Sequence, residues 1–330
     1  MRDPGFWWEE PGLRSALLSP FGMMYGAVSA KRMQKAGARC GVPVLCVGNF
    51  TLGGAGKTPT AIMIAQMLTA EGLKPFCLTR GYGGSIAGPK RVDLETDSAA
   101  TVGDEALLLA RTAPTIVARD RVAGANAAVA AGADVIVMDD GLQNGSLAKD
   151  FSLAVVDARR GIGNGCVFPA GPLRAPLDAQ LRRSDALLVI GDGAGADGIA
   201  AAAPHLTIFR GRLMPDQAAI ASLQARKVLA FAGIGDPEKF FATAIGAGLN
   251  VVQRRSFADH HRYNGEEAGD LIMQAEHDGL SLLTTEKDRA RMAGDPLLAA
   301  LAAKSHVLPV TLAVNEGDAL RRLVLEKVRR

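Results

Sequence analysis

The sequence predicts an α/β protein of the P-loop NTPase-like kind, with a mostly parallel sheet that has helices on both faces and a second, smaller α/β domain. Three observations predict this fold. Apolar runs typical of buried strands alternate along the chain with helical patterns. One of these runs, residues 44–47, leads directly into a glycine-rich turn and a Gly-Lys-Thr sequence. The strand pattern then restarts after Pro215, which predicts the second domain.

The composition is that of a folded globular protein. The chain has 330 residues, 48% hydrophobic and 22% charged, enough for two domains. A net charge of +3 and an aromatic content of 5% argue against a nucleic-acid-binding surface. The four cysteines are scattered without a C-x-x-C pair, so we expect reduced thiols in a cytosolic protein rather than a disulfide framework or zinc site.

Residues 1–40 form an aromatic and apolar segment that contains both tryptophans, Trp7 and Trp8. Ser19 and Pro20 predict a helix start, with serine as the N-cap and proline in the first turn. Large apolar residues recur at spacings of three and four, which places them on one helical face: Leu13, Leu17, Phe21, Met24 and Val28. Basic residues follow, which fits a helix lying in a membrane interface, but the same face also fits a helix packed on the core. The uncharged stretch 15–30 is shorter than the roughly 20 residues that span a bilayer.

The glycine-rich turn predicts a phosphate-binding loop. Its residues are Gly53, Gly54, Ala55, Gly56, Lys57 and Thr58. Glycines let backbone N–H groups surround a phosphate, and the following helix adds its unpaired donors. We expect Lys57 to reach the β- and γ-phosphates of a nucleotide and the Thr58 hydroxyl to hold Mg²⁺. The full motif has glycine at the position of Thr51, and a variant loop of some ATPases has lysine at the position of Leu52.

The strand predicted over 134–138 ends at Asp139 and Asp140. A carboxylate at such a strand end holds Mg²⁺ in P-loop enzymes, directly or through water. Two adjacent carboxylates repel each other unless a cation lies near them. We therefore favour a metal site here over simple turn residues.

Arginines stand at several predicted strand ends and in a proline-rich loop. The candidates for binding phosphoryl groups or the substrate are Arg80, Arg121 and Arg174. Arginines solvated in plain loops are the alternative for each of them.

The second half contributes further polar residues near strand ends. Adjacent to Asp259 are His260 and His261, and a histidine near a carboxylate can act in acid–base chemistry at neutral pH. Histidines in a surface loop are the alternative. Thr285 and Lys287 follow a predicted strand and are expected to border the nucleotide. The predicted domains are 1–40, a core over 41–215, and a smaller domain over 216–330 that closes a ligand cleft.

These motifs in their order resemble the tetraacyldisaccharide 4'-kinase (lipid A 4'-kinase) family over nearly the whole chain. The resemblance rests on 47–49, 53–59, 80–84, 103–105, 139–141, 169–174, 259–261 and 285–288. It implies transfer of the γ-phosphate of ATP, with Mg²⁺, to the 4'-hydroxyl of an acylated glucosamine disaccharide 1-phosphate in lipid A biosynthesis. It also implies peripheral attachment to the cytoplasmic face of the inner membrane through the N-terminal segment, with no obligate protein partner.

The resemblance also implies residue roles. By position alone, Asp104 and Glu105 are ordinary acidic residues of a first helical turn. The resemblance makes Asp104 the general base, tuned by His260, and groups Glu105 with Asp139, Asp140 and Thr58 around Mg²⁺. Asn49 joins the residues expected at the substrate.

Two positions depart from the family pattern: Asn144 stands where histidine is usual, and Ala175 where glutamate is frequent. Two other functions stay open at this point. One is a P-loop kinase of a soluble sugar or cofactor precursor, and the other is an ATP-driven switch that binds a partner protein.

Overall fold

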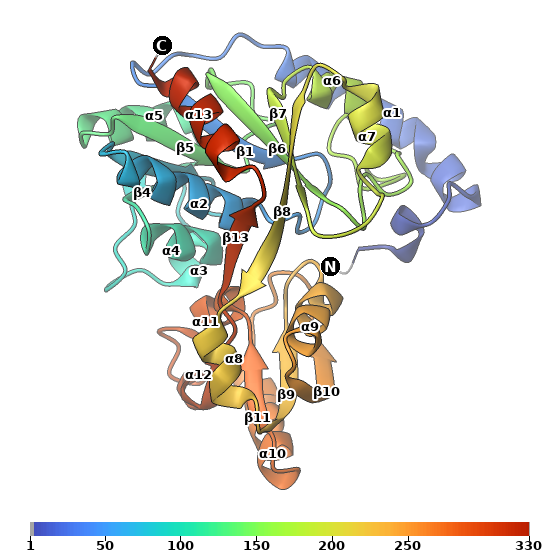
Figure 1. Cartoon of the computed structure of the whole chain (residues 1–330), viewed down its shortest axis with the longest axis vertical. Coiled ribbons are helices and arrows are strands. Elements are labelled where there is room, and N and C mark those ends of the chain that lie inside the picture. Colours follow the sequence, from blue (N-terminus) through green and yellow to red (C-terminus); the bar gives the residue numbers. More distant parts are fainter. Residues whose placement is uncertain (1–2, 330) are drawn as a thin grey trace.

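The computed structural model describes residues 3–329, which form two sheets of unequal size (Figure 1). Within that range, nine strands form the larger sheet in the order β13-β8-β7-β6-β1-β5-β2-β4-β3, and four form the smaller sheet in the order β10-β9-β11-β12. The larger sheet contains β1 (Val44–Asn49), β2 (Pro75–Thr79), β3 (Lys90–Arg91), β4 (Thr115–Val117), β5 (Val135–Asp139), β6 (Phe151–Asp157), β7 (Ala186–Ile190), β8 (Thr207–Pro215) and β13 (Val310–Val314). The smaller sheet contains β9 (Lys227–Ala232), β10 (Asn250–Ser256), β11 (Ser281–Thr284) and β12 (Ser305–Val307).

The centre of the larger sheet is parallel, as the alternating pattern predicts. β1 lies between β5 and β6 and pairs with both in parallel, so the carboxyl ends of these strands meet at one edge. Each of these strands is buried along its whole length, which explains why their sequences are mostly apolar. The antiparallel pairs, β3 with β4 and β8 with β13, lie at the two ends of the sheet.

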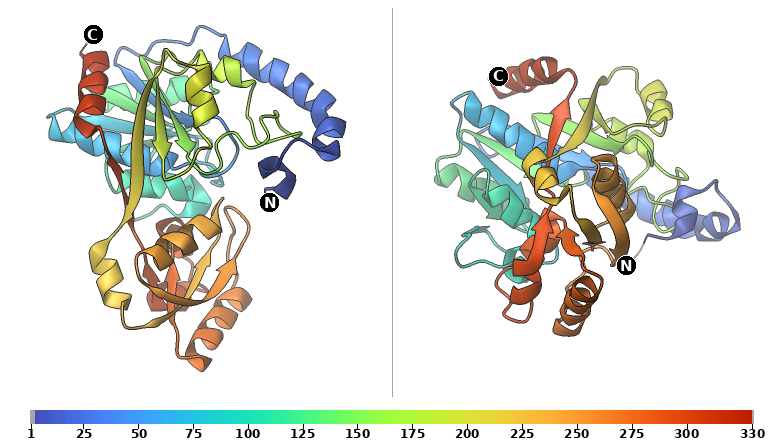
Figure 2. Two further views of the ribbon diagram at one scale, coloured as in Figure 1. Left: turned by 45° about the vertical axis from the view of Figure 1, so that its right-hand side comes forward. Right: turned by 60° about the horizontal axis from the view of Figure 1, so that its bottom comes forward.

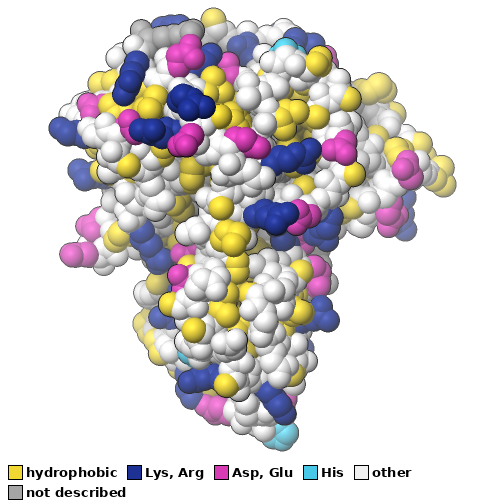
Figure 3. All heavy atoms as spheres, in the orientation of Figure 1, with side chains coloured by type: hydrophobic (Ala, Val, Ile, Leu, Met, Phe, Trp, Pro, Cys, Tyr) yellow, Lys and Arg dark blue, Asp and Glu magenta, His cyan; other side chains and the backbone are white. Residues whose placement is uncertain are grey.

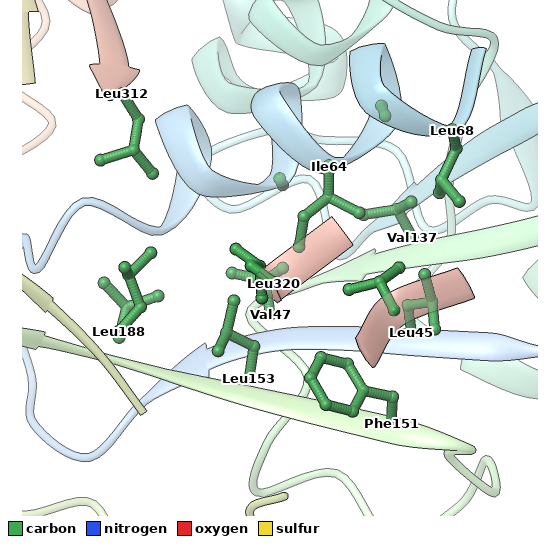
Figure 4. Packing of buried hydrophobic residues seen from close by; sticks show 14 of the residues in the cluster. Leu45, Val47, Ile64, Leu68, Val137, Phe151, Leu153, Leu188, Leu312 and Leu320 are labelled. Carbon is green, nitrogen blue, oxygen red and sulfur yellow. The ribbon is translucent and has the colours of Figure 1, made fainter. Parts of the chain in front are cut away.

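Helices cover both faces of the larger sheet. One face is covered by α2 (Lys57–Ala70), α4 (Asp104–Ala110) and α13 (Gly317–Val328), and the other by α5 (Arg121–Ala130), α6 (Leu177–Leu181) and α7 (Asp197–Ala202). Figure 4 shows Ile64 and Leu68 of α2 over Leu45, Val47 and Val137 of the sheet. The short helix α3 (Ala99–Val102) precedes α4.

The smaller sheet is entirely parallel and has its own two hydrophobic clusters. Its helices are α8 (Gln217–Leu223) and α9 (Pro237–Gly246) on one face, and α10 (Gly265–His277), α11 (Glu286–Met292) and α12 (Ala299–Lys304) on the other. Helix α11 also reaches the larger domain, where Ala290 packs with Ala106 and Leu107 of α4.

The chain does not stay in the second domain after residue 216, so the predicted boundary of 216–330 is wrong at its C-terminal end. β13 returns to the larger sheet and pairs with β8, and these two strands connect the domains (Figure 1). Leu312 of β13 and Leu320 and Val324 of α13 are buried in the core of the larger domain. Burial of these apolar side chains in the larger core stabilises the return of β13 and α13 to the larger domain.

The N-terminal segment consists of η1 (Gly5–Trp8) and the long helix α1 (Leu13–Met33), at the periphery of the larger domain (Figure 2). The predicted helix start at Ser19 is wrong, because Pro20 lies inside α1. After Pro20, the helix continues in close contact with residues 167–176, and glycine makes this approach possible. A Cβ on Gly22 would lie 2.7 Å from the Val167 carbonyl oxygen, and one on Gly26 would lie 3.3 Å from Pro176. In residues 3–329, no helix has the length and hydropathy needed to cross a membrane.

Candidate active site

The glycine-rich loop joins the end of β1 to α2, as predicted. Gly56, with φ +97°, precedes the first residue of the helix, Lys57, whose side chain is buried. Lys57 Nζ donates a hydrogen bond to Asn49 Oδ1 at 3.2 Å and lies 3.8 Å from Asp140 Oδ1. Burial lowers the pKa of Lys57, and the charge of Asp140 opposes that shift. The loop thus presents backbone N–H groups and one cation at the carboxyl edge of the sheet.

Asp139 and Asp140 end β5 beside this loop, but their surroundings differ. Asp139 is fully buried, and neither of its carboxylate oxygens has a hydrogen-bond partner. Burial, together with the charges of Glu105 and Asp140, raises the pKa of Asp139 to about 7. Arg174 Nη1 lies 2.8 and 2.9 Å from the two oxygens of Asp140. Although burial favours the neutral form, Arg174 and Lys57 hold the pKa of Asp140 well below its usual range.

The unpartnered carboxylate of Asp139 fits a divalent cation, because buried charge is costly without a counter-ion. Of the four predicted ligands, Glu105 is paired with Lys287 at 2.7 Å and Asp140 with Arg174, so both carboxylates are already neutralised. Thr58 follows Lys57 in the first turn of α2. Among residues 3–329 no group of three or more acidic, cysteine or histidine side chains is arranged to hold a metal ion alone. In nucleotide sites Mg²⁺ uses few protein ligands together with phosphates and water.

Asp104 and His260 come together across the junction of the two domains. Asp104, the first residue of α4, is 3% exposed, and its Oδ1 lies 3.5 Å from His260 Nδ1. Burial would raise the pKa of Asp104, but the hydrogen bond from His260 and the charges of Arg291 and Lys287 hold the pKa well below its usual value. His260 has φ +54°, and its ring centroid lies 4.7 Å from that of Tyr82.

His261 points elsewhere, so the geometry distinguishes two histidines that the sequence could not. Its Nε2 lies 2.9 Å from both carboxylate oxygens of Glu267, and its ring stacks on Phe257.

The remaining predicted residues lie at different depths. Arg174 lies in the site, where it is paired with Asp140. Arg121 is buried at the start of α5, where it donates to the Ala118 carbonyl and burial lowers the pKa of its guanidinium. Arg80 is exposed at the end of β2. Thr285 caps α11 and its hydroxyl donates to Asp288 at 2.6 Å, which gives it a structural role in this geometry.

The domains meet over the glycine-rich loop. A Cβ on Gly235, after β9, would lie 2.9 Å from the backbone nitrogen of Gly54, so this position tolerates only glycine at such a close approach. Ion pairs cross the same junction, among them Lys287–Glu105 and Lys239–Asp157. Figure 3 shows basic and acidic side chains together at the level where the two domains meet.

Arg291 was not predicted from the sequence, and its guanidinium contacts Asp104 Oδ2. A signal for it was present. Lys287 and Arg291 are four residues apart in α11, so both project from one helical face, and this spacing can be read in the sequence.

Comparisons with known proteins agree with the fold and the order of the motifs. The model of the family "Tetraacyldisaccharide-1-P 4'-kinase" matches residues 14–329. The chain is 53% identical over 330 residues to a tetraacyldisaccharide 4'-kinase of Rhodopseudomonas palustris (strain BisB5), covering 99% of this chain and 97% of the relative. It is 57% identical over 322 residues to one of Methylobacterium sp. (strain 4-46), covering 97% and 95% of the two chains.

A solved structure has the same fold: the "apo" form of LpxK from Aquifex aeolicus in complex with ATP. It superimposes with a TM-score of 0.73 at 24% identity and covers 96% of this chain and 100% of that chain. With the family model and the relatives extending over almost the whole length, the chain belongs to the tetraacyldisaccharide-1-P 4'-kinase family.

Proposed function

We propose that this protein transfers the γ-phosphate of ATP to the 4'-hydroxyl of an acylated glucosamine disaccharide 1-phosphate. The observation that carries the proposal is the combination of full-length family membership with a glycine-rich loop at the end of β1 and a buried carboxylate, Asp104, that lies 3.5 Å from His260. The acceptor oxygen forms a bond to the γ-phosphorus as the bond from that phosphorus to the bridging oxygen breaks. ADP leaves, and the hydroxyl proton passes to the protein.

Asp104 is the proposed acceptor of that proton, with His260 as its partner. Proton transfer by a positioned side chain requires a group within hydrogen-bond reach of the reacting hydroxyl. Two observations support Asp104 as the proton acceptor. Its side chain is buried in the larger domain, and its Oδ1 lies 3.5 Å from His260 Nδ1.

Lys57 and the backbone N–H groups of residues 53–58 are proposed to hold the triphosphate. Mg²⁺, when bound, neutralises charge on the β- and γ-phosphates. Asp139 is the residue best suited to hold it, with Thr58 next to the phosphates. Arg174, Arg121 and Arg80 are proposed to meet negative charge on the phosphoryl group or on the substrate's own phosphate, because arginine matches phosphate geometry.

The membrane-facing element is proposed to be α1. Its predicted apolar face is exposed rather than packed on the core: Leu13 is 77%, Leu17 67% and Phe21 58% exposed. Lys31 and Arg32 lie in its last turn. An exposed apolar face with a basic end suits a helix lying in an anionic lipid surface, which supports the proposal of peripheral attachment to the cytoplasmic face of the inner membrane.

The test is transfer of labelled γ-phosphate from ATP in detergent micelles containing Mg²⁺. Parallel samples contain acylated disaccharide 1-phosphate, a soluble sugar, or no acceptor. Label in the lipid alone is expected. Label in the soluble sugar would show that the protein is a kinase with a soluble acceptor. Label in free phosphate alone would favour an ATP-hydrolysing switch protein.

A further inference from the structure

The side chain of Arg291, in α11 of the second domain, is inserted between the two domains and is 5% exposed. Its Nε donates a hydrogen bond to Asp104 Oδ2 at 2.8 Å, and Nη2 donates to the same oxygen. A buried guanidinium that binds a carboxylate through two N–H groups makes a strong and directional contact.

The second domain holds Arg291 from the other side. Nη1 donates to the carbonyl oxygen of Gly233 and to Asp288 Oδ1, the latter at 2.9 Å. Asp288 is fully buried and also accepts from the Tyr263 hydroxyl at 2.9 Å and from the Gly233 N–H at 3.0 Å. The position of the guanidinium is therefore set by a connected buried network and not by Asp104 alone.

This arrangement divides the two oxygens of Asp104 between different tasks. Oδ2 is occupied by Arg291. Oδ1 accepts from the N–H of Glu105 at 3.0 Å and lies 3.5 Å from His260 Nδ1. Oδ1 is consequently the oxygen that is turned toward the histidine.

We propose that Arg291 is a positioning residue for phosphoryl transfer, which fixes the Asp104 carboxylate so that Oδ1 faces His260 and the acceptor hydroxyl. The inference rests on the proposed function, because it assigns the orientation of that reaction's base. Since Arg291 and Asp104 belong to different domains, the orientation of the base depends on the docking of α11 against α4.

A purely structural clamp between the domains is the competing explanation, and the chain supplies a matched control for it. Lys239 of α9 pairs with Asp157 Oδ2 at the end of β6, also across the domain junction. The Asp157 side chain is 7% exposed. Lys239→Met removes an ion pair between the domains without touching Asp104 or its partners.

The experiment compares Arg291→Met, Arg291→Lys and Lys239→Met with the unaltered full-length protein in the micelle assay. For Arg291→Met we expect kcat to fall by about 100-fold with the KM for ATP within a few-fold, because a misplaced base slows the reaction without loosening the triphosphate. Arg291→Lys should recover part of kcat, since an ammonium keeps the charge but cannot make the two-donor contact. Lys239→Met should keep kcat within about two-fold.

Chemical rescue separates positioning from structure. Arg291→Ala leaves a buried space shaped for a guanidinium, so added ethylguanidinium should raise kcat in a saturable way, and it should have no such effect on Lys239→Met or Asp104→Asn. The inference is overturned if Arg291→Met and Lys239→Met lose kcat equally, or if kcat and ATP binding fall together. If Arg291→Ala does not fold, the comparison of Arg291→Lys with Lys239→Met decides.

Different results would contradict the proposed function and the role of Arg291. If the unaltered protein labels no lipid, the proposed function is wrong. If it labels lipid and Arg291→Met does so at the same kcat, the positioning role alone is wrong.

Discussion

The role expected of Asp104 depends on its surroundings as well as on its position in the helix. As the first residue of α4 it stands where an acidic side chain merely complements the helix dipole. Its burial and its contacts with His260 and Arg291 give it a much more specific environment than that position requires.

Asp104→Asn tests the proposed base. The amide keeps the shape of the side chain but cannot accept the proton, so kcat should fall by about 10²- to 10⁴-fold while ATP binding stays largely intact. Binding is measured by titration with ATP and turnover by labelled transfer. An equal loss of both would remove Asp104 from the role of base.

The two adjacent histidines offer an internal comparison. His260→Gln should lower kcat by about 10-fold or more, because it removes the partner of Asp104. His261→Gln should leave kcat near its original value and lower only the thermal midpoint, since His261 contacts Glu267 and Phe257. Reversal of these two results would assign the functional contact to His261.

Asp139 allows a test of the metal site. Asp139→Asn should raise the Mg²⁺ concentration needed for half-maximal transfer by at least about 10-fold, because the amide has lost the charge that attracts the cation. Asp134→Asn, at the other end of the same strand, where Asp134 accepts from the Lys74 N–H, is the control and should not change it. Removing Mg²⁺ with a chelator should abolish transfer by the unaltered protein. An unchanged Mg²⁺ requirement in Asp139→Asn would place the ion elsewhere.

At the scale of the element, α1 differs from the other long helices because its large apolar side chains face outward. Apart from Met33, its buried positions are small residues, such as Gly22 and Gly26, which allow close contact with the loop that ends at Pro176. The helix thus packs on the protein mainly through small residues and exposes most of its large apolar side chains. A core helix has the opposite arrangement and buries its large apolar side chains.

Substituting this exposed face should affect membrane binding without affecting folding. Leu17→Asp combined with Phe21→Asp should reduce co-sedimentation with anionic phospholipid vesicles by about 10-fold or more, because each side chain loses the free energy of burying apolar area. Met273→Asp, at a side chain of α10 that is 62% exposed, is the matched control. Unchanged vesicle binding by the double variant would exclude α1 as the membrane contact.

At the scale of the whole molecule, the two domains are joined by the β8–β13 ribbon and by ion pairs across their junction. Asp157 belongs to one such pair. Burial opposes ionisation, but Lys239 and the backbone N–H groups of Arg159 and Arg160 hold the pKa of Asp157 below its ordinary value of 3.8.

A carboxyl group whose pKa is lower in the folded state stabilises that state above its unfolded pKa and loses the effect as the pH falls. Lys239→Met should therefore lower the thermal midpoint by a few degrees at pH 7, from a loss of about 1–2 kcal/mol. The difference should shrink as the pH falls below about 4. Calorimetry between pH 3 and pH 7 measures it, and a difference that is independent of pH would mean that the pair does not contribute through the ionisation of Asp157.

Local sequence determined much of this protein. The phosphate-binding loop, the strand ending at Asp139 and Asp140, and the alternation of strands and helices were all predicted because each is encoded by residues adjacent in the chain. Tertiary structure alone decided the return of β13 and α13 to the larger domain, the pairing of Asp140 with Arg174, and the approach of His260, and not His261, to Asp104. It also decided the contact of Arg291 with Asp104, 187 residues away in sequence. The physical reason is that such contacts depend on how two separately folded cores are packed against each other, and no periodicity within a short segment records that packing.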